Sequence, residues 1–292
     1  MKLISIIIPT YNRPKTLLTA LQSIKTERKE LIEVIVCNDY SSIKNDSENK
    51  YVIEKIRNES GLEIVYMDNS RNKGVSGARN TGIFSCNGKW IIFLDDDDVF
   101  VVDYIDNVID FINSAKSVDF IWSDIYLKVS DDKSKLIKKR FFINDDNELK
   151  NKVLTIGISF GVCIQKKCLI ECEGFNESFL VGEDTDLILK LLTRNCIFKH
   201  INYFGIIKNE NSLDMLSKNL SLYSQTNIVK RLLLGHFEYL KKDISLYCAI
   251  INRGNFIYLS EHKLIKNFFF NLKFILKHRN KLKVLKNVIW KF

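Results

Sequence analysis

Short apolar runs alternate with helical stretches through the first 125 residues, and this alternation limits the folds open to the chain. Four runs have the length and β-branched composition of buried strands: 3–8, 32–37, 62–67 and 89–94. A fifth predicted strand, 118–129, follows an amphipathic helical stretch at 102–112. Strands that alternate with helices form mostly parallel sheets covered on both faces. The sequence therefore predicts an α/β fold with a Rossmann-like, doubly wound and mostly parallel sheet.

The fourth apolar run leads directly into four consecutive carboxylates, in the sequence WIIFLDDDDV at 90–99. Like charges this close repel one another unless a positive group lies among them. A solvated acidic turn is one interpretation. The other is a divalent cation bound by Asp95, Asp97 and Asp98, since hard cations prefer carboxylate oxygens and often complete their shell with substrate phosphates.

Several polar residues follow predicted strands at one edge of the sheet. Tyr11 follows the first strand, Asp39 the second and the aspartate run the fourth. Ligands of open α/β sheets bind beyond the carboxyl ends of the strands. Asp39 could bind a base or sugar, or cap a helix. Arg79 could bind phosphate oxygens, or lie on the surface.

A second acidic cluster, Glu183, Asp184 and Asp186, opens a predicted helix at 182–196. Acids at a helix start usually cap it or interact with its dipole. One of them could instead act as a general base that takes a proton from an attacking hydroxyl. The sequence contains no phosphate loop, dinucleotide fingerprint or Gly-x-Ser-x-Gly elbow, so carboxylate chemistry is the remaining candidate.

Taken in order, four motifs resemble the family 2 glycosyltransferases: SIIIPTYNRPKTLLTALQSI, EVIVCNDYSS, NKGVSGARNTGIFSCNGKWIIFLDDDD and GEDTDLILKL. These are inverting enzymes with the GT-A fold that use nucleotide-activated sugars. The resemblance covers residues 3 to about 212. It implies transfer of a hexosyl or N-acetylhexosaminyl group from a nucleotide sugar, a UDP-sugar by family habit, to a hydroxyl of a glycan acceptor. Bacterial surface polysaccharide or lipooligosaccharide synthesis is the implied setting.

The resemblance also implies a role for individual residues. The nucleotide-sugar site comprises Pro9, Thr10, Tyr11, Asp39, Asp95 and Asp97. Arg79, proposed above from its positive charge, is expected to bind phosphate oxygens in the same site. A Mn²⁺ or Mg²⁺ ion is held by Asp97 and Asp98, next to Asp95. Asp184 is the catalytic base, with Glu183 beside it. The acceptor sugar lies near Gly174 and Phe175.

The sequence departs from the family pattern in two places. The usual Asp-Asp-Gly-Ser is Asn38-Asp39-Tyr40-Ser41 here, which keeps Asp39 but is expected to reshape the turn because the glycine is lost. The His and Arg often found downstream of the Glu-Asp pair are missing. Lys208 is then a candidate for the group that steadies the leaving diphosphate.

Two other functions compete with sugar transfer. A phosphatase of the haloacid dehalogenase type would use Asp95 and Asp97 in an Asp-x-Asp-x-Val motif. That motif usually follows the first strand of its domain, whereas three predicted strands precede it here. The second alternative is a non-enzymatic basic module that binds membrane or RNA through the C-terminal tail.

The tail accounts for the whole net charge of +9. Residues 262–292 contain nine Lys or Arg and no Asp or Glu, so subtracting nine from 44 basic residues leaves 35, equal to the 35 acidic ones. Lysines mixed with Phe, Leu, Ile and Trp suit an amphipathic helix on an anionic membrane, or a helical hairpin packed on the domain. We expect no nucleic-acid partner. The tail instead predicts attachment to the inner face of the cytoplasmic membrane, where a lipid-linked glycan acceptor would lie.

Three parts of the chain are expected: a nucleotide-sugar-binding half (1–125), an acceptor-binding half with the catalytic base (126–215) and a basic helical C-terminal extension (216–292). In the second half, 130–152 is expected to be an exposed excursion and 156–164 a strand, followed by a short helix that ends at Gly174. Residues 216–242 and 262–290 are expected to be helical.

The seven cysteines are scattered, and we expect buried thiols. Cys168 and Cys172 could face one way on a helix, but no second Cys or His pair at zinc spacing accompanies them. The N-terminus has no signal-peptide pattern, and no apolar stretch is long enough for a membrane span. The protein is therefore expected in the cytoplasm.

Overall fold

The structure is a computed structural model of the chain that describes residues 1–128, 136–139, 157–159, 161–209, 222–243, 246–248, 250, 276 and 284. The chain divides into two compact units. The sheet and both acidic clusters belong to the first (1–142, 157–187 and 194–214). The second contains α8 (Leu222–Gly235) and α9 (Phe237–Leu240), within the region 216–242 predicted to be helical.

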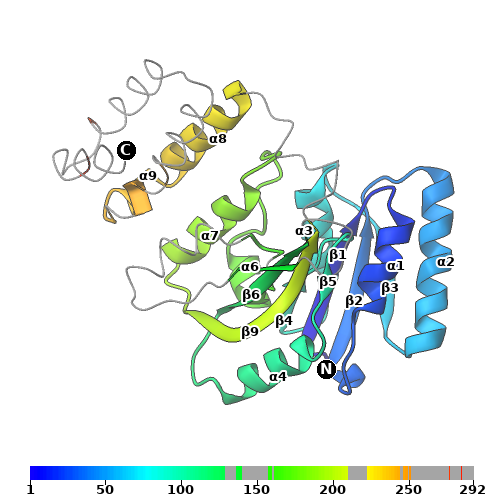
Figure 1. Cartoon of the computed structure of the whole chain (residues 1–292). Helices are drawn as coiled ribbons and strands as arrows, with labels where there is room; N and C mark the ends of the chain where they lie inside the picture. The colour runs from blue at the N-terminus through cyan, green and yellow to red at the C-terminus, as the bar shows by residue number, and fades with distance from the viewer. Residues whose placement is uncertain are drawn as a thin grey trace. The chain divides into compact units, whose positions relative to one another are not determined.

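The N-terminal part of the sheet is parallel, as predicted (Figure 1). The central strand β1 (Ile4–Thr10) pairs with β2 (Ile32–Asn38) on one side and β4 (Trp90–Phe93) on the other. The edge strand β3 (Ile64–Asp68) pairs with β2. These strands run in one direction, so their carboxyl ends reach the same edge of the sheet.

Helices cover both faces of this part. The core on one face joins β1 to α1 (Pro14–Gln22), α2 (Ile43–Ser60) and α4 (Tyr104–Ser114). The helix α3 (Val75–Ser85) packs against β1 and β2. A strand buried on both faces needs a continuous apolar run, which is why β1 reads ISIII.

Gly82 allows α3 to approach β1 very closely. A Cβ atom at this position would lie 2.6 Å from Ile7 Cγ2, inside van der Waals contact. Arg79 lies three residues earlier on α3, and residues three apart share a helix face. The close packing therefore fixes the position from which Arg79 extends.

The second part of the sheet is mixed. The long strand β9 (Phe198–Asn209) runs parallel to β6 (Phe120–Lys128) and antiparallel to the short β5 (Val99–Phe100). The antiparallel strand β8 (Cys163–Gln165) connects β4 to β6, and β7 (Leu136–Lys139) pairs with β6. The order is β3-β2-β1-β4-β8-β6-β9-β5, with β7 beside β6.

This mixed part differs most from the sequence prediction. The strand expected at 156–164 was wrong in extent. Among the described residues of this range, 158, 159 and 161 form turns and 157 has no regular structure, and β8 begins only at Cys163. Neither β9 nor β5 was predicted, because β9 is buried irregularly and lacks an apolar run. The helices α6 (Lys166–Glu171) and α7 (Glu183–Thr193) lie where helices were predicted.

The remaining sequence expectations concern the cysteines and the tail. All seven cysteines are free thiols; six are buried and Cys196 is partly exposed. Among the helices that the structure describes, none combines the length and apolar character that a membrane crossing requires. Nearly all of 262–290 lies outside the described residues, so its predicted helices stay a prediction.

Glu33 is a buried charge on β2 that connects three segments of the sheet. Its Oε1 accepts hydrogen bonds from Ser5 Oγ (2.6 Å) and from the N–H groups of Asn87 (2.5 Å) and Gly88 (3.1 Å). Asn87 Nδ2 donates to Oε2 (3.1 Å). Burial raises the pKa of Glu33, but these hydrogen bonds outweigh it and the pKa falls below its ordinary value. Glu33 therefore fastens β2 to β1 and to the turn that enters β4.

We expect Glu33→Gln to lower the free energy of unfolding by about 1–3 kcal/mol, measured by urea denaturation at pH 7, because a charged acceptor is lost from a buried network. The lowered folded-state pKa means that this stabilisation is present above the unfolded pKa of about 4.3 and is lost as the pH falls through the folded pKa. The difference between the two proteins should therefore shrink in acid. The half-exposed Glu63, which pairs with Lys2, is the matched control, and Glu63→Gln should cost less than about 1 kcal/mol. Equal losses in the two variants would contradict the role of Glu33.

Candidate active site

The aspartate run after β4 folds into a tight turn. The Asp98 N–H donates to the Asp95 carbonyl oxygen (3.1 Å), which bends the chain back on itself. Ligand oxygens of Asp95, Asp97 and Asp98 consequently lie within 4.8 Å of one another. Three hard oxygen donors this close suit Mg²⁺ or Mn²⁺.

Lys208 lies within this aspartate cluster. It extends from β9, and its Nζ donates to Asp98 Oδ2 (2.8 Å), Ser159 Oγ (3.0 Å) and Asp95 Oδ2 (3.3 Å). Burial lowers the pKa of Lys208, but the charges of Asp95 and Asp98 raise it well above the ordinary value. Lys208 therefore stays protonated. The sequence analysis proposed Lys208 in place of the missing His and Arg of the family pattern, and the structure places it beside the aspartate cluster.

Asp96 contacts the first loop and shares Arg13 with Asp97. Thr10 Oγ1 donates to Asp96 Oδ2 (2.8 Å), and Arg13 Nη1 lies 3.3 Å from Oδ1. Arg13 also reaches Asp97 Oδ2 (3.0 Å). Burial raises the pKa of Asp96 to about 7, against the opposing effects of Thr10 and Arg13. Sequence analysis missed Asp96 and Arg13, although Arg13 stands in the same PTYNRP loop as Thr10.

The charges in this cluster are only partly neutralised. Burial would raise the pKa of Asp95, but Lys208 and Arg79 hold it well below its ordinary range. Burial, with the neighbouring Asp95 charge, raises the pKa of Asp97 and brings that of Asp98 to about 7. An additional cation among these oxygens would relieve the repulsion, which is the physical reason that the run fits a metal.

Arg79 connects the two acidic clusters. Its side chain extends from α3 and is 4% exposed, so the alternative of a surface residue is wrong. Nη2 donates to Asp95 Oδ1 (2.8 Å), and Nη1 lies 3.4 Å from both Glu183 Oε1 and Asp184 Oδ1. One guanidinium thus joins the turn after β4 to the first turn of α7, far apart in the sequence.

The acidic residues at the start of α7 differ in their surroundings. Asp184 is one-quarter exposed, and its Oδ2 accepts a hydrogen bond from the Ile158 N–H (3.0 Å). Glu183 is less exposed, and burial together with Asp184 raises its pKa to about 7. Asp186 is buried. Of these three acids, Asp184 is the most exposed to solvent, and contacts with the Ile158 N–H and Arg79 orient its carboxylate.

At the end of β2, Asp39 is buried and links two loops. Both of its oxygens lie 2.9 Å from the Gly74 N–H at the start of α3, and Asn69 Nδ2 donates to Oδ1 (2.8 Å). The next residue, Tyr40, adopts φ +60°. This left-handed conformation explains the glycine of the family pattern, and it costs a tyrosine about 1 kcal/mol. The expected reshaping of the turn stays a prediction.

The end of β1 contributes the remaining predicted nucleotide-binding residues. Pro9 and Thr10 are buried within the strand, whereas Tyr11 is 45% exposed just beyond it. The Lys73 ammonium lies 4.7 Å from the centre of the Tyr11 ring. An exposed aromatic ring at the carboxyl edge of the sheet is suitable for stacking against a base.

Gly174 and Phe175, predicted near the acceptor, pack against residues of α3. Phe175 is 2% exposed, and its ring lies 5.3 Å from the Arg79 guanidinium and edge-on to Phe93. Gly174 has φ +66°, and a Cβ there would lie 2.3 Å from Asn80 Oδ1. The structure therefore gives both residues a packing role, and contact with an acceptor stays a prediction.

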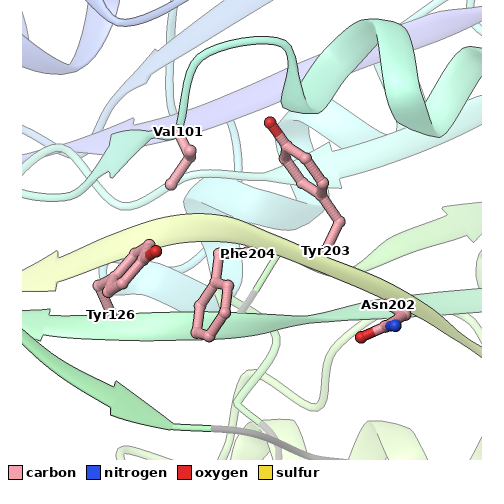
Figure 2. A pocket seen from close by; sticks show the side chains of 5 residues that line it. All are labelled: Val101, Tyr126, Asn202, Tyr203 and Phe204. Atoms are coloured by element: carbon pink, nitrogen blue, oxygen red, sulfur yellow. The ribbon is translucent and has the colours of Figure 1, made fainter.

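A cavity of about 320 Å³ lies beside β9 (Figure 2). Its described lining residues are Val101, Tyr126, Asn202, Tyr203 and Phe204, with no carboxylate among them. The rings of Tyr126 and Phe204 stack 4.3 Å apart. The candidate active site is thus defined by its converging charges and not by this cavity.

Arg79→Ala should lower the free energy of unfolding by about 3–5 kcal/mol, because it leaves buried carboxylates without their shared cation. Denaturation in urea measures the change. Arg28→Ala removes a guanidinium from an exposed pair with Asp110 and should cost less than about 1 kcal/mol. A loss for Arg79→Ala no larger than for Arg28→Ala would contradict the bridging role.

Two of the curated proteins similar to this chain are bacterial glucosyltransferases. An Escherichia coli UDP-Glc:alpha-D-GlcNAc-diphosphoundecaprenol beta-1,3-glucosyltransferase, WfaP, is 34% identical over 128 residues, covering 44% of this chain and 48% of its own. A Campylobacter jejuni GalNAc(5)-diNAcBac-PP-undecaprenol beta-1,3-glucosyltransferase is 24% identical over 248 residues, covering 82% and 74%. This chain therefore spans about half the length of the E. coli relative.

The fold and the family are also identified. The structure of Staphylococcus aureus TarS 1–349 in complex with UDP-GlcNAc superposes with a TM-score of 0.72 at 17% identity, covering 94% of this chain and 81% of that one, which confirms the GT-A fold. The profile described as glycosyl transferase family 2 matches residues 5–176, from β1 through the aspartate run to Phe175 and its neighbour. That match sets aside the phosphatase alternative. The chain belongs to glycosyl transferase family 2.

Proposed function

We propose that this protein is an inverting glycosyltransferase that transfers a hexosyl or N-acetylhexosaminyl group from a UDP-sugar to a hydroxyl of a lipid-linked glycan. The contact of Arg79 with Asp95 on one side and Asp184 on the other carries the proposal, because it joins a cation-competent cluster to a candidate base. The undecaprenol-linked substrates named for the two bacterial relatives support the acceptor class. The UDP-GlcNAc bound to TarS and the UDP-Glc of WfaP support the donor.

The donor nucleotide is proposed to bind at the ends of β1 and β2. Tyr11 offers an exposed ring to the base, and Pro9 and Thr10 form the end of the strand behind it. Asp39 Oδ1 already accepts from Gly74 and Asn69, so the lone pair proposed for a base or ribose donor is on Oδ2, which accepts from the Gly74 N–H as well. Its buried, fixed position favours selective recognition.

The diphosphate is proposed to lie beside the aspartate cluster. Asp97 and Asp98, with Asp95, would hold a Mn²⁺ or Mg²⁺ ion, and the closeness of their oxygens supports this assignment. Such an ion, when bound, offsets negative charge on the leaving diphosphate as a Lewis acid. Lys208 and Arg79 add two fixed positive charges to the same region and orient the carboxylates.

Asp184 is proposed as the general base. The Ile158 N–H and Arg79 orient its carboxylate, which is positioned to take the proton of an acceptor hydroxyl. The hydroxyl oxygen then forms a bond to the anomeric carbon as the bond from that carbon to the diphosphate oxygen breaks. A single displacement inverts the configuration. Glu183, whose raised pKa of about 7 also suits a base at neutral pH, is the second candidate.

The C-terminal tail is proposed to hold the protein on the inner face of the cytoplasmic membrane. Its nine basic residues without an acidic one would each contribute about 1 kcal/mol near an anionic surface. Attachment there would place the site next to lipid-linked glycans of surface polysaccharide or lipooligosaccharide synthesis. RNA binding, the alternative for the tail, has no support from the family match.

Asp184→Asn should reduce the rate of sugar transfer by a factor of about 10²–10⁴, the usual contribution of a general base, without changing donor binding. Transfer is measured as UDP release from UDP-Glc or UDP-GlcNAc with Mn²⁺ and a synthetic GlcNAc-diphospholipid acceptor. Binding of UDP with Mn²⁺ is measured by calorimetry. Asp97→Asn, the counterpart variant, should weaken this Mn²⁺-dependent binding.

Glu183→Gln distinguishes the two candidate bases. Both substitutions keep the size of the side chain and remove its proton-accepting charge, so the two variants can be compared directly. Because Asp184 is the proposed base, Glu183→Gln should retain more transfer activity than Asp184→Asn. Transfer at the wild-type rate in Asp184→Asn would overturn the assignment of the base. Mn²⁺-independent binding of UDP by the wild-type protein would overturn the metal assignment.

A further inference from the structure

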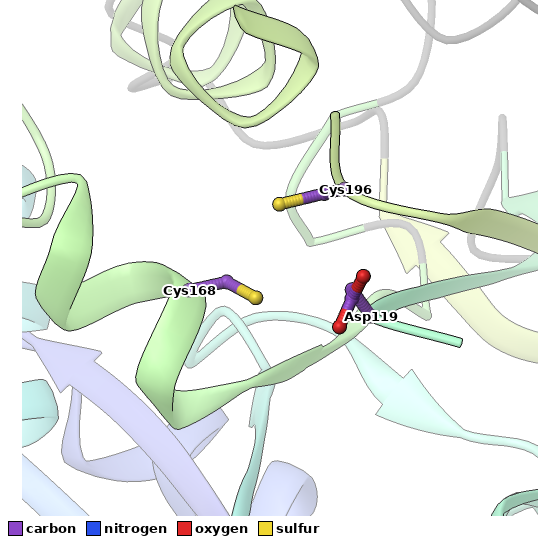
Figure 3. A group of neighbouring side chains, drawn as sticks. All are labelled: Asp119, Cys168 and Cys196. Carbon is purple, nitrogen blue, oxygen red and sulfur yellow. The ribbon is translucent and has the colours of Figure 1, made fainter. Parts of the chain in front are cut away.

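Three metal-ligating side chains converge at a second place in the first unit. Ligand atoms of Asp119, Cys168 and Cys196 lie within 4.8 Å of one another (Figure 3). Gln165, which precedes α6, pairs with Trp90 at the amino end of β4, whereas the aspartate run follows the carboxyl end of that strand. The cluster is therefore at the opposite end of β4 from the candidate active site.

The three segments that carry these ligands are joined by backbone hydrogen bonds. The N–H groups of Asp119 and Phe120 both donate to the Ile197 carbonyl oxygen (2.8 and 3.0 Å). The Gln165 N–H donates to the Asp119 carbonyl oxygen (2.9 Å). The start of β6, the residues before α6 and the start of β9 thus form one rigid scaffold. A preorganised ligand set loses little entropy when an ion binds.

The ligands of this cluster differ in burial, and one of them is already oriented by the backbone. Cys168 is buried and Cys196 is partly exposed, and the thiolate is the form of each that binds a metal. The Ile197 N–H donates to Asp119 Oδ2 (3.0 Å), an outer hydrogen bond of the kind that orients a ligating carboxylate.

We propose that Asp119, Cys168 and Cys196 form a Zn²⁺ site that ties the chain after α7 to α6 and β6. Two sulfur donors and one carboxylate favour zinc over the hard cations of the aspartate cluster. Binding converts two thiols to thiolates and releases two protons, and water fills the fourth position. Cys196 follows α7 closely in the chain, so the ion anchors the far end of the segment whose first turn carries Asp184. Spacing rules missed the site because its ligands come from three elements.

Cobalt titration tests this site on the full-length reduced protein. Co²⁺ is added with Mg²⁺ in excess to occupy the aspartate cluster, and the thiolate-to-cobalt charge-transfer absorption is followed in the near ultraviolet. We expect the band to saturate at one equivalent of Co²⁺ and to disappear when Zn²⁺ is added. Cys168→Ser and Cys196→Ser should each abolish or strongly weaken it. Cys86→Ser, which removes a buried thiol outside the cluster, should leave the band unchanged.

Alkylation of the wild-type protein provides a test that needs no variant. Zn²⁺ should slow the alkylation of Cys168 and Cys196, mapped by mass spectrometry, and leave the rate at Cys86 unchanged. Absence of the cobalt band in the wild-type protein, or its persistence in both serine variants, would overturn the proposal. Rapid formation of a Cys168–Cys196 disulfide that Zn²⁺ does not slow would also overturn it, because the pair would then be a redox couple.

Discussion

The contacts of one buried guanidinium hold this site together. Arg79 donates to Asp95 and lies within 3.4 Å of Glu183 and Asp184, so three carboxylates from two distant segments contact one guanidinium. Without it, burial and mutual repulsion would favour protonation or separation of the acids. The guanidinium is 4% exposed and lies 5.3 Å from the Phe175 ring, and such burial strengthens these charged contacts. The arrangement of both acidic clusters depends on this one side chain.

The fold positions Arg79 and its partners through two different halves of one sheet. The parallel half brings the ends of β1, β2 and β4 to one edge, and the absence of a side chain at Gly82 lets α3 pack directly on β1. The mixed half brings β9 beside β5, and that pairing carries Lys208 to Asp95 and Asp98. The aspartate turn therefore follows a strand of the parallel half. Its negative charge is partly neutralised by Arg79 from the parallel half and by Lys208 from the mixed half.

Sequence reasoning predicted the parallel half well because its strands are continuous apolar runs. The β9 strand escaped prediction because its burial alternates irregularly and its partner β6 carries a bulge at Ser123–Asp124. The aspartate run was identified by composition alone, but the separate role of Asp96 was not, since it depends on the packing of Thr10 and Arg13. Its positive charge made Arg79 a candidate for phosphate binding, but the sequence did not reveal that it bridges both clusters.

A double-mutant cycle between Asp95 and Asp184 tests the shared guanidinium most directly. The free energies of unfolding of the wild-type protein, Asp95→Asn, Asp184→Asn and the double variant are measured under one condition. If both carboxylates interact through Arg79, removal of one changes the effect of removing the other. We predict an interaction energy of about 0.5–3 kcal/mol. Effects that add to within about 0.5 kcal/mol would show two independent clusters and would contradict the account.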